Sequence, residues 1–145
     1  MHRFWKQDRR GVAALEFVLV APSLFIVIFA GAELSILLAK YMTLTNAAVV
    51  GATQFAFSAG VSATPYDDAV NAIQASASTL NLPTSGISLS VNGTACNTNA
   101  LCGSALQAGT GYVTVQLTYS CSGLNMFYNM LPACSISSHQ TERVQ

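Results

Sequence analysis

One acidic residue lies near the start of the longest apolar stretch of the chain. Glu16 comes five residues after Gly11 and is followed by an apolar run that reaches about Ala39. On translocon-insertion scales, an acidic side chain at the centre of a membrane-spanning helix costs about 2.5 to 3.5 kcal/mol. Acids within such helices usually have a partner or a task. The sequence therefore predicts a specific role for Glu16, close to the basic pair Arg9-Arg10.

The four cysteines are the second group with evident chemistry. They all lie in the C-terminal half, and an even number in an oxidising compartment favours disulfides. Of the three possible connectivities we favour Cys96–Cys102 with Cys121–Cys134, because each pair then closes its own loop. Zinc binding is the alternative, but the spacings are not typical of zinc sites. A tetrahedral site would also need His139, the only histidine of this half, as a fourth ligand.

The remaining reactive side chains form no recognisable catalytic motif. His139 lies near Glu142 with no nucleophile at a familiar spacing. Asp67 and Asp68 begin a predicted helix, where acids favour the helix dipole. The segment 109–111 is too short for a phosphate-binding loop. We therefore expect a protein that is not an enzyme, with no cofactor, no metal and no small-molecule substrate.

The composition and the charge distribution indicate the environment of the elements that position these residues. Hydrophobic residues make up 52% of the 145 and charged residues 8%, about a third of the charge that soluble proteins usually carry. Residues 1–11 hold four basic side chains and one acidic one, whereas residues 12–145 hold two basic and five acidic ones. A basic flank tends to remain in the cytoplasm. The remainder is then outside, with no basic patch for nucleic acid.

Two simple interpretations fit the first forty residues. A secretory signal peptide would use the basic leader and a cleavage site after Ala32, in Ala30-Gly31-Ala32, although the apolar stretch is longer than usual. A plain single-pass anchor fits the span, because about 20 apolar residues cross the hydrocarbon core and residues 17–32 carry no charge. Neither interpretation gives a reason for both Gly11 and Glu16.

The N-terminus also resembles the processing site of type IV pilin-like proteins. The resemblance rests on the leader ending Arg9-Arg10-Gly11 and on Glu16 as fifth residue after the glycine. It implies that a prepilin peptidase cuts between Gly11 and Val12 on the cytoplasmic side. The new α-amine of Val12 would be cationic, and pairing with a carboxylate lowers the cost of both charges in lipid. The resemblance implies that Glu16 supplies this pairing across neighbouring subunits.

A narrower resemblance follows from the residues after the glycine. Classical type IV pilins begin with Phe where this chain has Val12, while an aromatic residue after the glutamate, Phe17, is typical of the wider group. The stretch from Gly11 to Pro22 is similar to the start of the TadE-like family, the minor pseudopilins of the Tad (Flp) pilus. The strand 113–115 and Arg143 also fit, and the TadF type shares much of the pattern. The implied partners are the peptidase, other pilin or pseudopilin subunits and the Tad assembly machinery at the inner membrane.

Two helices are predicted. The first continues beyond the membrane over residues 34–58, with Gly60 as a stop signal. Its small residues recur at four-residue spacing, which allows close packing, either on a neighbouring helix or behind the outer domain. The second helix starts at Thr64-Pro65-Tyr66-Asp67, which is close to a capping box, and should end before Pro83. Its apolar face comprises Val70, Ile73, Ala77 and Leu80.

Alternating apolar and polar residues predict strands over 87–91 and 113–119, with a weaker one over about 135–141. Asn92-Gly93 marks a turn, and residues 92–111 read as a long loop. The expected fold is α+β, with a long N-terminal helix, a short second helix and a small antiparallel sheet. We expect a basic leader over 1–11, a transmembrane and extended helix over 12–60, and a periplasmic domain over 61–145.

The segment 122–133 is unusually apolar for a loop. It could fold back as core, contact the membrane surface, or form a partner site. The candidate contact residues are Leu124, Met126, Phe127, Tyr128 and Met130.

The sequence thus predicts a single-pass inner-membrane protein with its C-terminal domain in the periplasm. After cleavage it would act as a minor pilin by packing helix against helix. The alternatives are a membrane-anchored periplasmic binding module and a secreted domain released after Ala32.

Overall fold

The computed structural model describes residues 9–107, 111–120 and 134–144, with side chains described from Ala14 onward. It divides into two compact units, one reaching to Ile36 and the other starting at Leu37. The predicted α+β class is confirmed. In chain order the elements are α1 (Arg9–Phe57), α2 (Pro65–Ser76), the 3-10 turns η1 (Ser78–Leu80) and η2 (Thr84–Gly86), β1 (Ile87–Val91), β2 (Thr94–Cys96), α3 (Asn99–Leu106), β3 (Tyr112–Ser120) and β4 (Ser135–Arg143).

The helix α1 is continuous over 49 residues and contains a single internal proline, Pro22. It ends at Phe57, close to the predicted end at residue 58. Gly60 follows with a φ of 70°, the left-handed conformation that glycine adopts at low cost after a helix. The predicted stop signal therefore lies where the chain leaves the helix.

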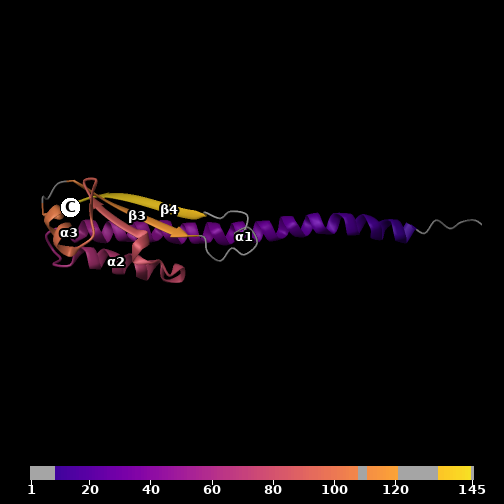
Figure 1. Ribbon diagram of the computed structural model, residues 1–145, viewed down its shortest axis with the longest axis horizontal. Coiled ribbons are helices and arrows are strands. Elements are labelled where there is room, and N and C mark those ends of the chain that lie inside the picture. Colours follow the sequence, from indigo (N-terminus) through magenta and orange to yellow (C-terminus); the bar gives the residue numbers. More distant parts are fainter. Residues whose placement is uncertain (1–8, 108–110, 121–133, 145) are drawn as a thin grey trace, which may run out of the picture. The chain divides into compact units, whose positions relative to one another are not determined.

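The four strands form one antiparallel sheet in the order β2-β1-β3-β4 (Figure 1). The turn between β1 and β2 is the predicted Asn92-Gly93 pair, and Val91 is paired with Thr94 across it. Both turn residues have positive φ, 51° and 81°, as a type I′ hairpin requires. Asn92 also fixes the next strand, because its amide donates to the Tyr112 carbonyl and its Oδ1 accepts from the Tyr112 amide.

The expected long loop over residues 92–111 is wrong. This segment contains β2 and the whole of α3. Its polar, glycine-containing composition concealed a helix whose start is capped by Thr98, which accepts a hydrogen bond from the Leu101 amide at 3.3 Å. Cys96 at the end of β2 is bridged to Cys102 in α3, and this covalent link stabilises a short helix of weak local pattern.

The core lies between the sheet, α2 and the C-terminal part of α1. One face of the sheet is apolar, and its side chains pack against buried residues of both helices. Gly51 of α1 allows the close approach, because a Cβ at this position would overlap the Ile73 side chain of α2 and lie 3.7 Å from Val115 of β3. The buried residues of α1 are Leu44, Ala47, Ala48, Ala52, Phe55 and Ala56.

Candidate assembly site on the N-terminal helix

The predicted processing residues lie at the beginning of α1. Arg9, Arg10, Gly11 and Val12 have helical backbone, and their side chains lie outside the described part of the structure. Glu16 follows in the second turn of the same helix and is exposed. The structure thus brings the predicted cleavage position and Glu16 onto one short helical segment.

The segment that follows Glu16 is apolar on all sides. Phe17 is 68% exposed, and every large hydrophobic side chain from Val18 to Phe29 is at least half exposed. Within the described residues, one helix, Ala14–Phe57, is long and apolar enough to cross a membrane, and it lies near the N-terminus. Side chains that are apolar all round a helix match a lipid or helix-bundle environment. This feature indicates either a single membrane span or a signal sequence.

The length of α1 exceeds what a membrane requires. Its 49 residues correspond to about 74 Å at 1.5 Å per residue, whereas the hydrocarbon core is about 30 Å thick. More than half of the helix therefore extends beyond one hydrocarbon layer. The C-terminal part is the piece that contributes to the core of the second unit.

This C-terminal part of α1 carries large apolar side chains on two opposite faces. One face is buried under the sheet, with Leu44 and Phe55 fully covered. The other face is exposed, and its apolar residues follow a helical spacing of seven and eight positions. We call this second set the exposed stripe; it comprises Met42, Val49, Val50 and Phe57. The exposed amide side chain of Asn46 lies among them on the same face.

Hydroxyl groups along α1 are satisfied by the helix itself. Ser35 Oγ donates to the Gly31 carbonyl at 2.8 Å, and Thr53 Oγ1 donates to the Val49 carbonyl at 2.8 Å. Such back-bonding to the preceding turn removes a polar group that would otherwise need a partner. The hydroxyl donors of these residues therefore need no further hydrogen-bond partner at the surface of the helix.

The small-residue pattern noticed in the sequence has a different location from the exposed stripe. Ala47, Gly51, Ala48, Ala52 and Ala56 are buried, so these residues back the outer domain, one of the two roles that the spacing allowed. Sequence reasoning missed the exposed stripe. Its signal was the recurrence of large apolar residues at Met42, Val49, Val50 and Phe57, on the face opposite the small residues.

Lys40 belongs with the second unit. Its ammonium lies over the ring of Tyr119 in β3, 5.4 Å from the ring centroid, a cation–π contact. This gives the one basic residue of the extended helix a protein partner rather than only an interfacial position.

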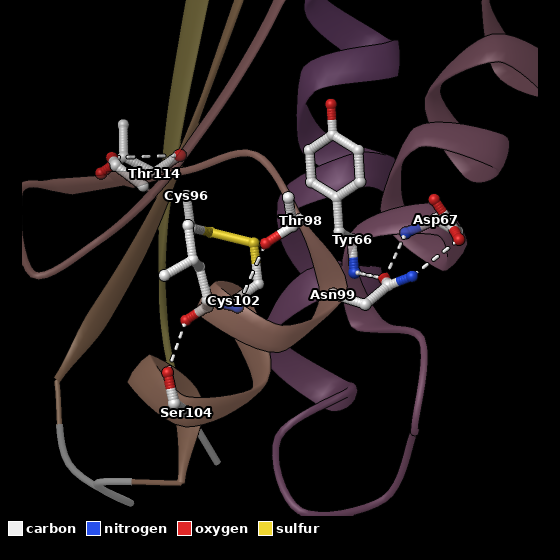
Figure 2. Close-up of a disulfide and its surroundings, with 10 residues drawn as sticks. Tyr66, Asp67, Cys96, Thr98, Asn99, Cys102, Ser104 and Thr114 are labelled. Carbon is white, nitrogen blue, oxygen red and sulfur yellow. Dashed lines mark hydrogen bonds between the residues drawn. A yellow bond between two sulfur atoms is a disulfide. The ribbon is translucent and has the colours of Figure 1, made fainter.

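The disulfide region lies where α2 and α3 begin (Figure 2). Cys96 and Cys102 are bridged, with their Cα atoms 5.2 Å apart, and both are buried. Beside this bridge, Asn99 caps α2 from a distance: its Oδ1 accepts hydrogen bonds from the amides of Tyr66 at 3.0 Å and Asp67 at 3.1 Å. Its Nδ2 donates to Asp67 Oδ2 at 2.7 Å. The starts of α2 and α3 are thus held together.

The predicted cap of α2 is therefore partly wrong. Pro65 is the first helical residue as expected, but Thr64 makes no side-chain capping bond. Its hydroxyl instead donates to Asp68 Oδ1 at 3.3 Å. Asn99, more than thirty residues later in the chain, takes the capping role.

Several predicted site residues lie outside the described residues. Cys134 is disulfide-bonded, but Cys121, its predicted partner, is in the segment that is not described, so the Cys121–Cys134 bridge stays a prediction. The same applies to the candidate contact residues Leu124, Met126, Phe127, Tyr128 and Met130.

Comparison with known proteins addresses the segment that carries this site. Residues 11–53 match the family model described as TadE-like protein. No curated protein and no solved structure matches the chain. The matched residues begin at the glycine of the predicted processing site and include Glu16, the apolar span and most of the extended helix. Over this segment, which is less than a third of the chain, the sequence matches the TadE-like protein family.

Proposed function

We infer the function from the family that residues 11–53 match. The TadE-like pilin family is non-enzymatic and implies the Tad pilus machinery as the setting. A subunit of an assembly needs a membrane anchor, a group that fixes its axial position relative to neighbouring subunits, and a packing surface. These are the features to explain.

We propose that this protein is a minor pilin whose mature form begins at Val12 and that enters Tad pilus assembly by packing α1 against the helices of other subunits. The observation that carries the proposal is the exposed stripe. Phe57 is 55% exposed and Met42 58% exposed, in a helix too long to be covered by lipid over its whole length. A contiguous apolar helix surface beyond the bilayer is typical of a site that another protein element covers.

Glu16 supplies the register in this proposal. A prepilin peptidase cuts between Gly11 and Val12, with Arg9 and Arg10 in the discarded leader, and the new α-amine of Val12 pairs with Glu16 of a neighbouring subunit. Each charge is costly alone in an apolar bundle and much less costly when paired. Axial displacement of a subunit would separate the two charges, so the pair favours one position. Phe17, the exposed aromatic residue beside Glu16, packs in the same helix contact.

The protein acts at the inner membrane, with its N-terminus in the cytoplasm and the unit from Leu37 onward in the periplasm. Its partners are the peptidase, other pilin or pseudopilin subunits and the Tad machinery. The Cys96–Cys102 disulfide supports the location of this unit, because such bridges persist in the periplasm and not in the cytoplasm.

The first test is the N-terminus of the mature protein, determined by mass spectrometry of membranes from the native host with and without its prepilin peptidase. The proposal requires a peptide that begins at Val12 and disappears without the peptidase. A start at Glu33 would identify a cleaved signal peptide and a secreted domain. An intact Met1 in both strains would identify a plain anchored protein.

The second test separates processing from assembly. Glu16→Gln removes the charge at nearly constant volume, and we expect normal cleavage at Val12 but an about ten- to hundredfold loss of incorporation into the sheared pilus fraction or its assembly complex, because the amine loses its counter-charge. Glu142→Gln, the same change on β4 in the second unit, is the matched control and should assemble normally. Normal assembly of Glu16→Gln would contradict the register role.

A further inference from the structure

The turn between β1 and β2 contains the only asparagine of this sequence that is followed by glycine, Asn92-Gly93. In such a pair the glycine nitrogen can attack the side-chain carbonyl carbon of the asparagine, because glycine has no Cβ to hinder the approach. A bond forms between Cγ and this nitrogen, the side-chain amide leaves as ammonia, and a five-membered succinimide remains. Water then opens the ring to aspartate, or to isoaspartate, in which the backbone continues through the side chain. Asn92 is exposed, so both the attack and the hydrolysis have access to solvent.

The folded turn prevents this ring from closing. Asn92 and Gly93 have φ of 51° and 81°, as in a type I′ turn, where ψ of the first residue is about 30°. With this ψ, Cβ of an L-residue and the next backbone nitrogen lie about 150° apart around the Cα–C bond. A succinimide needs the two atoms on the same side of that bond. Asn92 therefore has to leave the turn conformation before its side chain can react.

Hydrogen bonds and packing hold Asn92 in the unreactive conformation. Its Oδ1 accepts a hydrogen bond from the Tyr112 amide at 3.0 Å, and its own amide donates to the Tyr112 carbonyl at 2.9 Å. A Cβ on Gly111 would overlap the Asn92 side chain, so this side chain lies directly against the backbone of Gly111. Rotation about the Cα–C bond of Asn92 disrupts these contacts. The reaction thus requires separation of the turn from the start of β3.

We propose that Asn92 is a deamidation site that is closed in the folded protein and reacts whenever the β1–β2 turn is open. The two products differ in their effect on folding. Aspartate retains an oxygen acceptor for the Tyr112 amide and tolerates positive φ, so this product still forms the hairpin. Isoaspartate lengthens the backbone of a two-residue turn, and the length of such a turn sets the strand register. A chain that remains open is thereby converted in part to a form that cannot close correctly.

The register at this turn matters for the core. The strand β1 lies between β2 and β3 in the sheet, and its Leu89 and Val91 side chains are buried. A slip by one residue would move both to the opposite face of the sheet. The site lies within the second unit, and the inference does not depend on the pilus role.

The test measures deamidation of the full-length protein by peptide mass spectrometry, with fragmentation that distinguishes isoaspartate from aspartate. One sample is kept folded in detergent micelles and the other is unfolded in guanidinium chloride at the same pH. We expect conversion of Asn92 to be at least about tenfold slower in the folded sample, because the reaction requires local opening. Asn81 is the internal control: its φ is also positive, 46°, but Leu82 follows it, so it should convert slowly in both samples. Equal rates at Asn92, or no conversion in the unfolded sample, would overturn the proposal.

A less stable hairpin tests the role of opening. Replacing Cys96 and Cys102 together by serine frees the end of β2 from α3 and should raise the conversion rate of Asn92 in micelles about tenfold. An unchanged rate in this variant would contradict protection by the fold.

The two products are then separated by their ability to fold. When the incubated, unfolded sample is returned to refolding conditions, isoaspartate should be found in the protease-sensitive fraction and aspartate in the protease-resistant one. Asn92→Asp, which represents the aspartate product, should unfold near the wild-type temperature. Isoaspartate in the protease-resistant fraction at its original proportion would show that it does not block the hairpin and would refute that part of the proposal.

Discussion

Gly51 should be intolerant of the smallest possible side chain. It is buried in α1, and a Cβ there would overlap Ile73 Cγ1 and lie 2.6 Å from Ile73 Cδ1. Ile73 is fully buried, and its β-branched side chain has few alternative rotamers. Val115 lies 3.7 Å away on the sheet side. The contact with Val115 is an ordinary van der Waals distance, so Ile73 of α2 is the obstacle to the new methyl group.

Two effects of opposite sign decide the result of Gly51→Ala. Alanine is about 1 kcal/mol better than glycine inside a helix, which would stabilise the fold. Overpacking of a filled core typically costs about 1 to 3 kcal/mol, and the overlap with Ile73 places this case in the upper part of that range. We expect a net loss of about 1 to 2 kcal/mol. For a domain of about 100 residues this lowers the unfolding midpoint by about 4 to 16 °C.

The assay is thermal unfolding of the full-length chain in detergent micelles, followed by circular dichroism, with Gly103→Ala as the matched control. Gly103 also lies inside a helix, α3, but a Cβ there would have only Pro65 Cγ nearby, at 3.9 Å. The control should therefore gain about 0.5 to 1 kcal/mol from helix propensity alone. The same substitution thus has opposite predicted signs at Gly51 and Gly103.

A double substitution identifies the cause. Ile73→Ala alone leaves a cavity and should cost about 2 to 5 kcal/mol, but Gly51→Ala added to it should cost little or stabilise the chain, because the clashing atoms are gone. A Gly51→Ala protein at least as stable as wild type would refute the packing argument. Additive effects in the double variant would show that Ile73 is not the obstacle.

Two further predictions concern the region of Figure 2. Asn99→Ala removes the acceptor of two α2 amides and the 2.7 Å hydrogen bond to Asp67, so it should lower the free energy of unfolding by about 1 to 2 kcal/mol, measured by chemical denaturation. Thr64→Ala, at the local cap position, should change the stability little. A larger loss in Thr64→Ala than in Asn99→Ala would show that the cap is local. Replacing Cys96 and Cys102 together by serine opens a loop of six-residue separation and should cost about 2 kcal/mol, measured by urea unfolding of the full chain. An unchanged midpoint in that variant would mean that the hydrogen bonds alone fix α3.

The elements that local pattern could predict are those whose signal lies within a short stretch of sequence. Ile87, Leu89 and Val91 alternate with serines, and Asn92-Gly93 closes the hairpin, so β1 and its turn were predictable from local sequence alone. The strand β3 followed from the same alternation. The predictions of the processing site and of a role for Glu16 rest on the spacing between Arg9 and Glu16, which is also local.

What the sequence did not predict depends on distant contacts. The segment that forms α3 is rich in polar residues, and its helix depends on a disulfide and on Asn99, which bonds to α2. The cap of α2 comes from Asn99 rather than from Thr64 for the same reason. The two apolar faces of α1 could not be told apart by periodicity alone, because only the presence of the sheet determines which one is buried.

The helix α1 supplies both the apolar N-terminal span and part of the core of the second unit, and this has a consequence for how the protein is made. Phe55 is synthesised about sixty residues before Leu117, although both belong to the same buried core. At about 5 to 20 residues per second, the core face of α1 leaves the ribosome about 3 to 12 s before the strand that covers it. During that interval the core face of the helix lacks the strands that cover it, and the nascent chain presents a target for chaperones and proteases. Correct biogenesis of this protein therefore depends on timing, because synthesis of the core face of α1 has to be followed quickly by closure of the sheet over the helix.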